Sequence, residues 1–382
     1  MKKDKTIACD VLVVGAGVSG VAAAVAASRA GARTVLIEKN LLPGGIAVDC
    51  SHRYLCGLYP QNHGLTLELI LQLQHLSPQN GFSALGKLPV FHFRPQDLKT
   101  ALRKISAVKN LNIFYNTRLT RIIKTQKTIN TVQANHGKLN FKPKVVIDAS
   151  GTGQAIKLSG AKYRLGSLKS RPLAGFTFDT TGLKDSSGLL PIKIPYLLRG
   201  AVDQNKLPAY FRFANFYYGQ NRSSGTIKLN LLPSNNLRGK KVTKKYASLI
   251  HNYLRKNLPE FKHSKITTVS SEVHEREGIR LHGKYTLNEK DILNAKSSGK
   301  LAARGYWPIE FWDQKQGQMI TYLKPGKAYG IALDCLRSIN VSNLLATGKC
   351  ISATSRALAS SRVTGTCIYL GESAGKLAAK SL

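Results

Sequence analysis

Acidic residues are scarce in this sequence. The chain of 382 residues has 20 Asp and Glu against 57 Lys and Arg, a formal net charge of +37. Such an excess attracts nucleic acids, anionic membrane surfaces and acidic metabolites. However, no dense basic block stands out, and no aromatic-interleaved basic motif of a nucleic-acid-binding module occurs. A basic surface spread over the whole protein is therefore favoured, and a nucleic-acid partner stays possible but is not favoured.

Cysteine pairs and long apolar runs are also absent. None of the six cysteines forms a C-x-x-C pair, so the sequence predicts no metal site. No segment approaches about 18 uninterrupted apolar residues, which predicts no membrane span. The basic N-terminus before an apolar stretch resembles a signal peptide. That stretch contains the motif described next, which cleavage would destroy, so we expect it to be part of the mature protein. We expect a reducing compartment, the cytoplasm.

Four apolar residues at 11–14 lead into Gly15, Gly17 and Gly20. This is a G-x-G-x-x-G motif between an expected buried strand and an expected Ala-rich helix. Gly15 permits the tight turn, Gly17 lets the backbone approach a pyrophosphate, and Gly20 lets helix and strand pack closely. The first N–H groups of the helix and its dipole then face the phosphates. The motif predicts a dinucleotide site.

A second apolar strand ends at Glu38, whose carboxylate can accept two hydrogen bonds from a ribose diol. The strand, the glycines, the helix and this acid are in register, which is the context that supports the motif. Gly44 and Gly45 follow closely, an arrangement of FAD enzymes that simple NAD enzymes usually lack. No second G-x-G-x-x-G occurs, which disfavours NADPH-dependent monooxygenases and pyridine-nucleotide disulfide reductases.

The remaining pattern indicates an α/β fold. Apolar spacing predicts helices at 65–76, 95–107, 245–257 and 366–379, and strands at 112–115, 119–124, 128–134, 139–149, 173–180, 208–217, 225–231 and 343–348. We therefore predict a Rossmann-like FAD-binding domain with a parallel sheet, formed by residues 1–165 and 330–382. An inserted substrate or cap domain with mixed or antiparallel β structure is expected at 166–329.

Together these segments resemble the FAD-dependent oxidoreductases of the glutathione-reductase-like flavoprotein superfamily over nearly the whole chain. The resemblance rests on the first glycine motif with its acid, the Gly44–Gly45 pair, the strand and glycines at 147–153, and the tail at 343–375. Two residues depart from the family pattern. Thr152 stands where an acid is usual and Lys349 where Arg is usual, and both positions are expected to lie beside the cofactor.

The resemblance implies noncovalent FAD and a set of cofactor-binding residues. The strand residue Leu119 would contact adenine through its backbone, and Gly348 would approach the ribityl–pyrophosphate region. The start of the last helix, near Thr366, would direct N–H groups at the flavin N1–C2=O edge, where reduced flavin is negative. The complete set is Gly15, Gly17, Gly20, Glu38, Lys39, Gly45, Leu119, Gly151, Gly348 and Thr366.

Two residues are candidates for catalysis. Arg362 would hold a substrate carboxylate or carbonyl over the flavin, or would form a structural salt bridge or phosphate contact. His52 would act as an acid or base, or would be a hydrogen-bonded structural histidine. For Arg276, which lies between two acids, a structural ion pair is favoured.

Two further groups have alternative interpretations. Cys50 and Cys56 lie near the position where disulfide reductases place a redox pair, but five residues separate them instead of four, so incidental thiols are favoured. An aromatic group would line an apolar substrate pocket or belong to the core. Its members are Tyr306, Trp307, Trp312 and Tyr329.

The sequence thus predicts an FAD-dependent oxidoreductase that transfers a hydride between an organic small molecule and FAD. The substrate and the electron donor or acceptor stay unknown. One alternative is a flavoenzyme that modifies or binds RNA through its basic surface. Another is a non-catalytic binding module that contains FAD.

Overall fold

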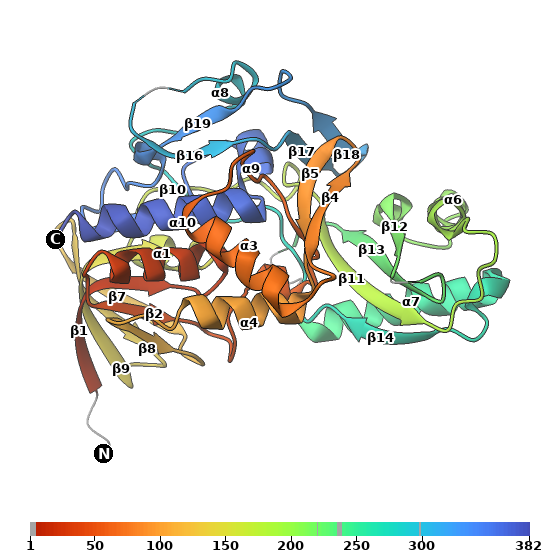
Figure 1. The fold of residues 1–382 in the computed structure, drawn as a ribbon, viewed down its shortest axis with the longest axis horizontal. Coiled ribbons are helices and arrows are strands. Elements are labelled where there is room, and N and C mark those ends of the chain that lie inside the picture. Colours follow the sequence, from red (N-terminus) through yellow and green to blue (C-terminus); the bar gives the residue numbers. More distant parts are fainter. Residues whose placement is uncertain (1–4, 220, 235–238, 298) are drawn as a thin grey trace.

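The computed structural model describes residues 5–219, 221–234, 239–297 and 299–382. A seven-stranded sheet lies at the centre of the part of the chain outside residues 166–329, here called the first region (Figure 1). Its parallel strands run in the order β6 (Leu111–Phe114), β2 (Thr34–Ile37), β1 (Lys5–Val14), β9 (Leu139–Asp148) and β20 (Leu344–Ala346). The second half of β1, residues 9–14, and all of β2 are buried, as expected for strands covered on both faces.

The sheet joins segments that are far apart in the sequence. The antiparallel hairpin of β7 (Leu119–Thr125) and β8 (Thr128–Ala134) pairs with the first part of β9. The C-terminal strand β20 pairs with the last part of β9. The predicted α/β class is therefore confirmed, with a parallel sheet that is discontinuous in sequence.

Helices α1 (Val18–Arg29) and α10 (Thr364–Ala379) pack side by side along the sheet (Figure 1). Glycines at the contact let the two backbones approach, because a Cβ at Gly371 or Gly375 would lie 2.1 Å from a carbonyl oxygen of α1. α3 (Gly64–Leu76) and α4 (Pro95–Ile105) pack against each other beside this pair. The three-stranded sheet beside them contains β3 (Tyr54–Leu55), β5 (Leu88–His92) and β4 (Gly81–Leu85).

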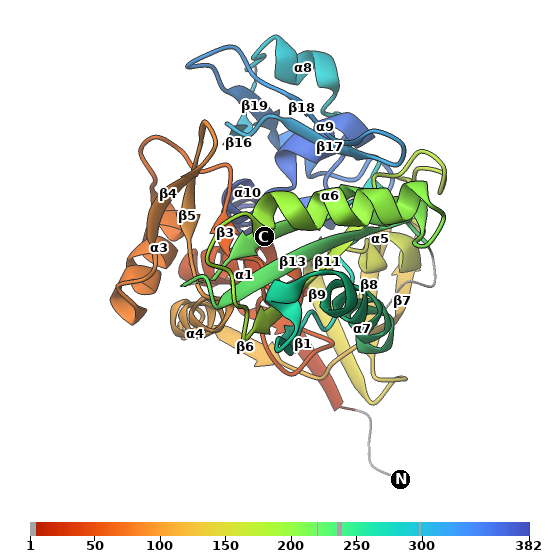
Figure 2. The ribbon, with the colours of Figure 1, turned by 90° about the vertical axis from the view of Figure 1, so that its right-hand side faces the viewer.

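A second, antiparallel sheet forms the cap. Its order is β12 (Asn215–Tyr218), β13 (Ser224–Leu231), β11 (Ala174–Thr181) and β14 (Lys265–Val269). α6 (Leu190–Asp203) and α7 (Lys240–Asn257) pack on this sheet through one apolar cluster drawn from residues 174–273 (Figure 2). Because successive strand residues point to opposite faces, the polar residues of β11 and β13 face away from that cluster.

Short elements complete the fold. They are α2 (Ile46–Asp49), α5 (Gln154–Leu158), α8 (Glu289–Leu293), α9 (Ser355–Ser361) and the strand pairs β10 (Tyr163–Arg164) with β15 (Arg280–Leu281), β16 (Leu301–Gly305) with β19 (Tyr329–Ala332) and β17 (Ile309–Asp313) with β18 (Gly317–Thr321). Apolar side chains between residues 287 and 331 belong to the same core as α1 and α10. The domain boundaries at 166 and 329 stay predictions. No helix within the described ranges is long and apolar enough to cross a membrane.

Three segments of the cap differ from the sequence-based expectation, and one of them is β14, which the apolar pattern does not predict. The predicted strand at 208–217 is a 3-10 helix, Ala209–Phe213, followed by β12, and Pro208 precedes the first residue of that helix. α6 was not predicted because Pro191 and Pro195 interrupt its sequence. Its buried residues nevertheless follow helical spacing, and Pro191 lies in its first turn, where a missing N–H is tolerated.

Candidate functional site

A cavity of about 1280 Å³ lies between the carboxyl ends of the parallel strands and the cap sheet. The turns after β1, β2, β9 and β20 line one side, and residues of β11 and β13 line the other. Ligands of open α/β sheets bind at this edge of the strands. The described residues contain no group of three or more His, Cys, Asp or Glu that could hold a metal ion.

The three glycines after β1 have different surroundings. Gly15 has a φ of +103°, and a Cβ there would lie 2.7 Å from the Ala149 carbonyl oxygen. A Cβ at Gly20 would lie 1.8 Å from the Gly15 carbonyl oxygen. At Gly17, by contrast, no heavy atom of the described residues apart from its two chain neighbours lies within 4 Å of such a Cβ, and Gly17 lines the cavity. Gly17 thus leaves room for a ligand, which fits the close approach of a pyrophosphate at the N-terminus of α1.

Glu38 lies at the end of β2 and is 6 % exposed. Its Oε2 accepts a hydrogen bond from the Ala16 N–H at 2.6 Å, and its Oε1 accepts one from the Asn40 N–H at 2.9 Å. Each carboxylate oxygen keeps a second lone pair, so Glu38 can still accept from a ribose diol. The residues at this end of the cavity therefore fit a dinucleotide.

The Gly44–Gly45 pair packs across the turn that contains Gly15, Gly17 and Gly20, here called the fingerprint turn. The Gly44 N–H donates to the Ala16 carbonyl at 2.8 Å, and a Cβ at Gly45 would lie 3.1 Å from the Gly17 Cα. Gly45 and Lys39 both line the cavity beside Glu38. The structure thus brings these predicted residues together.

The glycine segments that follow β9 and β20 close the same end. Gly151, Thr152, Gly348 and Lys349 all line the cavity. The Lys349 ammonium donates to the Glu275 carbonyl at 2.6 Å, and burial lowers the pKa of this lysine. Lys349 therefore has a protein partner of its own, in the position where the family usually has arginine.

Three predicted cofactor residues lie behind the cavity lining. Gly20 packs on the fingerprint turn, Leu119 is buried in β7, and Thr366 is buried in α10. At the start of α10 the Gly365 N–H donates to the Cys56 carbonyl at 2.8 Å, so it does not point into the cavity. Thr364 and Val363, two and three residues before Thr366, line the cavity instead. Cofactor contacts of these residues stay predictions.

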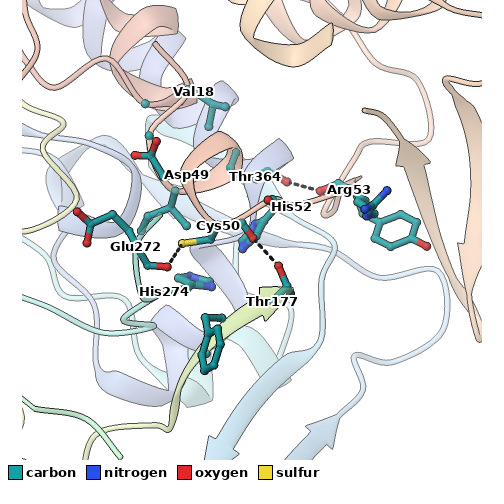
Figure 3. A pocket seen from close by; sticks show the side chains of 18 of the residues that line it. Val18, Asp49, Cys50, His52, Arg53, Thr177, Glu272, His274 and Thr364 are labelled. Atoms are coloured by element: carbon teal, nitrogen blue, oxygen red, sulfur yellow. Dashed lines mark hydrogen bonds between the residues drawn. The ribbon is translucent and has the colours of Figure 1, made fainter. Parts of the chain in front are cut away.

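His52 lines the cavity and packs edge-on against His274, with ring centroids 4.8 Å apart (Figure 3). Burial lowers the pKa of His52 to about 3 and holds the pKa of His274 well below its usual value. Both imidazoles are therefore neutral near neutral pH. His52 is a weak base in this environment, and its catalytic role stays a prediction.

Cys50 and Cys56 are free thiols. The Cys50 thiol donates to the Glu272 carbonyl at 3.3 Å (Figure 3), and burial raises the pKa of both thiols. A redox pair needs a thiolate nucleophile, which this environment disfavours. The geometry supports the interpretation of both residues as incidental thiols.

A cluster of charges that the sequence did not predict lies at the cap end of the cavity. Lys228 of β13, Glu310 of β17 and Arg362 before α10 all line it. Another polar pair lies nearby, because Arg53 bonds Asp179 at 3.0 Å. A signal for Lys228 exists in the sequence, since residues 226, 228 and 230 are polar and alternate with apolar residues, which places Lys228 on the open face of β13.

Arg276 lies in the same cluster but is held by neutral groups. Its guanidinium donates to the Leu173 carbonyl and to Asn230 Oδ1, and it stacks on the Trp312 ring at 4.3 Å. The ion pair with a neighbouring acid expected for Arg276 does not form, because Glu277 bonds Arg280 at 2.7 Å instead.

The four candidate aromatic residues separate into two groups. Trp307 and Trp312 line the cavity, and both indole N–H groups donate to Glu310, at 3.0 and 2.8 Å. Tyr329 is fully buried and bonds Ser360 at 2.7 Å, while Tyr306 packs against Tyr59. The tryptophans form part of the cavity wall, and Tyr329 belongs to the core.

Comparison with known proteins gives a consistent result. A family model described as FAD dependent oxidoreductase matches residues 10–382. The alpha subunit of sarcosine oxidase from Rhizobium meliloti (strain 1021) is 60 % identical over 37 residues, 10 % of this chain and 4 % of that protein. Mitochondrial dihydrolipoyl dehydrogenase from Bos taurus is 27 % identical over 191 residues, 50 % of this chain and 34 % of that protein. The chain thus spans about a third or less of the length of these relatives.

Among solved structures, a geranylgeranyl bacteriochlorophyll reductase-like protein from Thermoplasma acidophilum superimposes with a TM-score of 0.49 and 14 % identity. That match covers 98 % of this chain and 78 % of the other.

Proposed function

Because the chain belongs to the FAD dependent oxidoreductase family, we propose that it is an enzyme that transfers a hydride between a small organic molecule and noncovalently bound FAD. The observation that carries this proposal is one continuous cavity. It extends from the fingerprint turn, where Gly17 leaves open space, to the polar face of the cap sheet. A dinucleotide at one end and a substrate at the other fit such a cavity.

The residues of the first region would hold the cofactor. Gly17 and the N-terminus of α1 would bind the pyrophosphate, and Glu38 would bind the adenosine ribose. Bound FAD supplies the hydride chemistry, which no side chain provides. The start of α10, at Val363 and Thr364, would stabilise negative charge that develops in the cavity.

The residues of the cap end would orient the substrate. Arg362 would bind a polar group of the substrate, and Trp307 and Trp312 would exclude water from the reacting centre. His52 is neutral in this environment and would serve as a hydrogen-bonding group rather than as a strong base.

We also propose a reducing compartment for the protein, the cytoplasm. All six cysteines lie within the described ranges and are free thiols. Free thiols are typical of proteins kept under reducing conditions.

The first experiment is a visible absorption spectrum of the purified protein, followed by heat release and chromatography of the chromophore. We expect flavin bands, FAD in the supernatant, and bleaching on anaerobic reduction. Released apoprotein should rebind FAD but not NAD, which serves as the matched control ligand. A colourless protein that takes up no added FAD would contradict the proposal. A bound flavin that resists reduction would favour the non-catalytic module.

A further inference from the structure

We propose that the substrate carries a carboxylate or an equivalent small anionic group, which Lys228 and Arg362 bind at the cap end of the cavity. This inference rests on the proposed function and deepens it, because it names the class of substrate that the same cavity takes. It depends on two cations that have no hydrogen-bond or ion-pair partner among the described residues, on the charge balance around them, and on the two directions from which they reach the cavity.

Lys228 and Arg362 both line the cavity and are half-buried. Within the described part of the chain, neither the Lys228 ammonium nor the Arg362 guanidinium takes part in a hydrogen bond or an ion pair. Two other cavity cations do have such partners, because Arg53 bonds Asp179 and Lys349 bonds the Glu275 carbonyl. A cation withdrawn from water without a partner is costly, so such a group in a cavity favours an anionic ligand.

The charge balance leaves room for an anion. Burial and the charges of Arg276 and Arg362 lower the pKa of Lys228 to about 8, and burial and Arg362 lower the pKa of Arg276 to about 9. Lys228 and Arg276 also lie over the same Trp312 ring, at 4.4 and 4.3 Å from its centroid, so these two cations are close together. The charge of Glu310 acts in the opposite direction, because it favours the protonated form of all three cations.

Glu310 is already committed to other donors. Burial alone would raise its pKa, but Lys228, Arg362 and the two indoles lower it. Its carboxylate accepts from Trp307, Trp312 and the Gln318 amide, the last at 3.0 Å. Glu277 also acts on Arg362 but is engaged by Arg280. Three cations therefore face one ionised carboxylate that neutralises them incompletely.

The two unpartnered cations reach the cavity from different parts of the fold. Lys228 extends from the open face of β13 in the cap, and its ammonium lies 4.4 Å from the Trp312 ring centroid. Arg362 lies between α9 and α10 in the first region, next to the cavity-lining start of α10. A carboxylate bound by both would bridge the cap and the nucleotide-binding region, and the guanidinium would supply a bidentate contact.

Calorimetric titration of the purified holoprotein with two matched pairs of probes tests this inference. The pairs are acetate with acetamide and benzoate with benzamide, which differ in charge but little in shape. We expect each carboxylate to bind at least about tenfold more tightly than its amide, because only the carboxylate pairs with the cations. Equal affinities within both pairs would overturn the inference.

Variants identify the residues responsible. Lys228→Met and Arg362→Met are each expected to weaken acetate binding about tenfold or more, and Lys228→Arg should restore it. The matched control is Lys265→Met, which removes an exposed lysine of β14, at the edge of the same sheet. Acetate affinity should also fall above about pH 8 in the parent protein, where Lys228 deprotonates, and at higher pH in Lys228→Arg. Unchanged acetate affinity in both Met variants would refute the assignment.

The flavin itself is the competing partner for these cations. If they served only to stabilise reduced flavin, Lys228→Met would lower the flavin reduction potential and leave acetate affinity unchanged, which would overturn the inference. Failure of the proposed function would be seen in a separate observation, namely that the purified protein contains no FAD and takes up none. Calorimetry detects acetate binding with or without the flavin, so the two failures are distinguishable.

Discussion

At the scale of single residues, the fingerprint glycines show that one motif can combine two kinds of requirement. Gly15 and Gly20 are needed by the protein itself, because any side chain there would meet backbone atoms. Gly17 has an ordinary φ of −65° and open space in front of it. The protein therefore leaves space for a ligand at that position, as the proposed pyrophosphate site requires.

We therefore expect opposite results from two alanine substitutions. Gly17→Ala should fold with unchanged stability but bind FAD about tenfold more weakly or worse, about 1.4 kcal/mol, because its Cβ would occupy space needed by the pyrophosphate. Gly20→Ala should lose about 3 kcal/mol of unfolding free energy through overpacking. Urea unfolding and FAD titration of the apoprotein measure both effects. Equal FAD affinity in Gly17→Ala and the parent would exclude a cofactor at this turn.

Asp49 gives a pH-dependent prediction at the same end of the cavity. Burial, followed by the charges of Glu38 and Glu272, raises the pKa of Asp49 to about 6. The folded state then binds a proton more tightly than the unfolded state, so this residue's contribution to stability is lost as pH rises from about 4 through about 6. Asp49→Asn removes that loss, while the Asn40 amide, which donates to Asp49 at 3.1 Å, keeps an acceptor.

The variant should therefore equal the parent near pH 4 and exceed it at pH 8 by about 1 kcal/mol, after allowance for solvent screening. Urea unfolding across this pH range is the measurement. Asp334→Asn, a substitution of an acid outside the cavity lining, is the control. A variant that is less stable than the parent at pH 8 would show that the Asp49 charge is needed.

At the scale of elements, the contact between α1 and α10 depends on glycine. The Cβ of an alanine at Gly371 or Gly375 would lie 2.1 Å from the carbonyl oxygens of Ser19 and Ala23. The helices would have to separate, and we expect each substitution to cost about 3 kcal/mol of unfolding free energy. Because α10 begins at the cavity, FAD affinity should fall as well.

Gly200→Ala in α6 is the matched control for this prediction. No heavy atom of the described residues lies within 4 Å of a Cβ built there. This substitution should raise stability by about 0.5–1 kcal/mol, because glycine is a poor residue inside a helix. Thermal and urea unfolding distinguish the two cases, and equal effects at 200, 371 and 375 would contradict the packing argument.

The sequence predicts some elements of this fold and not others. The strands and helices around the parallel sheet were predicted because their apolar patterns are long and regular, and Gly15 to Glu38 form a local motif. The cluster of Lys228, Glu310 and Arg362 could not be predicted as a unit, because its members lie 52 to 134 residues apart in the sequence and meet only through the tertiary fold. Arg362 was singled out by its place before the last helix, and Lys228 was missed.

At the scale of the whole molecule, the charge of +37 is the dominant feature. It also motivates the RNA-binding alternative. If the charge acts without a dedicated site, homopolymeric RNAs of different sequence should bind with similar affinity, and this affinity should fall steeply between about 50 and about 300 mM salt. Fluorescence titrations at several salt concentrations measure both properties. A single preferred RNA that saturates at a defined site size would instead favour the RNA flavoenzyme.

The same charge affects folding stability. With 57 basic and 20 acidic residues, at least 37 cations have no acid available as an exclusive partner, since 57 − 20 = 37. Most cations therefore repel one another in the folded state, and unfolding relieves this repulsion. At 0.1 M salt, interactions between exposed charges that lie more than about 10 Å apart are largely screened. We therefore expect the thermal midpoint to rise by several degrees between about 20 and about 300 mM NaCl, whereas a protein stabilised mainly by exposed ion pairs would lose stability.

Calorimetry of the holoprotein provides the measurement, and the same series in sucrose controls for excluded-cosolute effects. A falling midpoint would mean that the ion pairs, such as Arg29 with Glu68, outweigh the general repulsion.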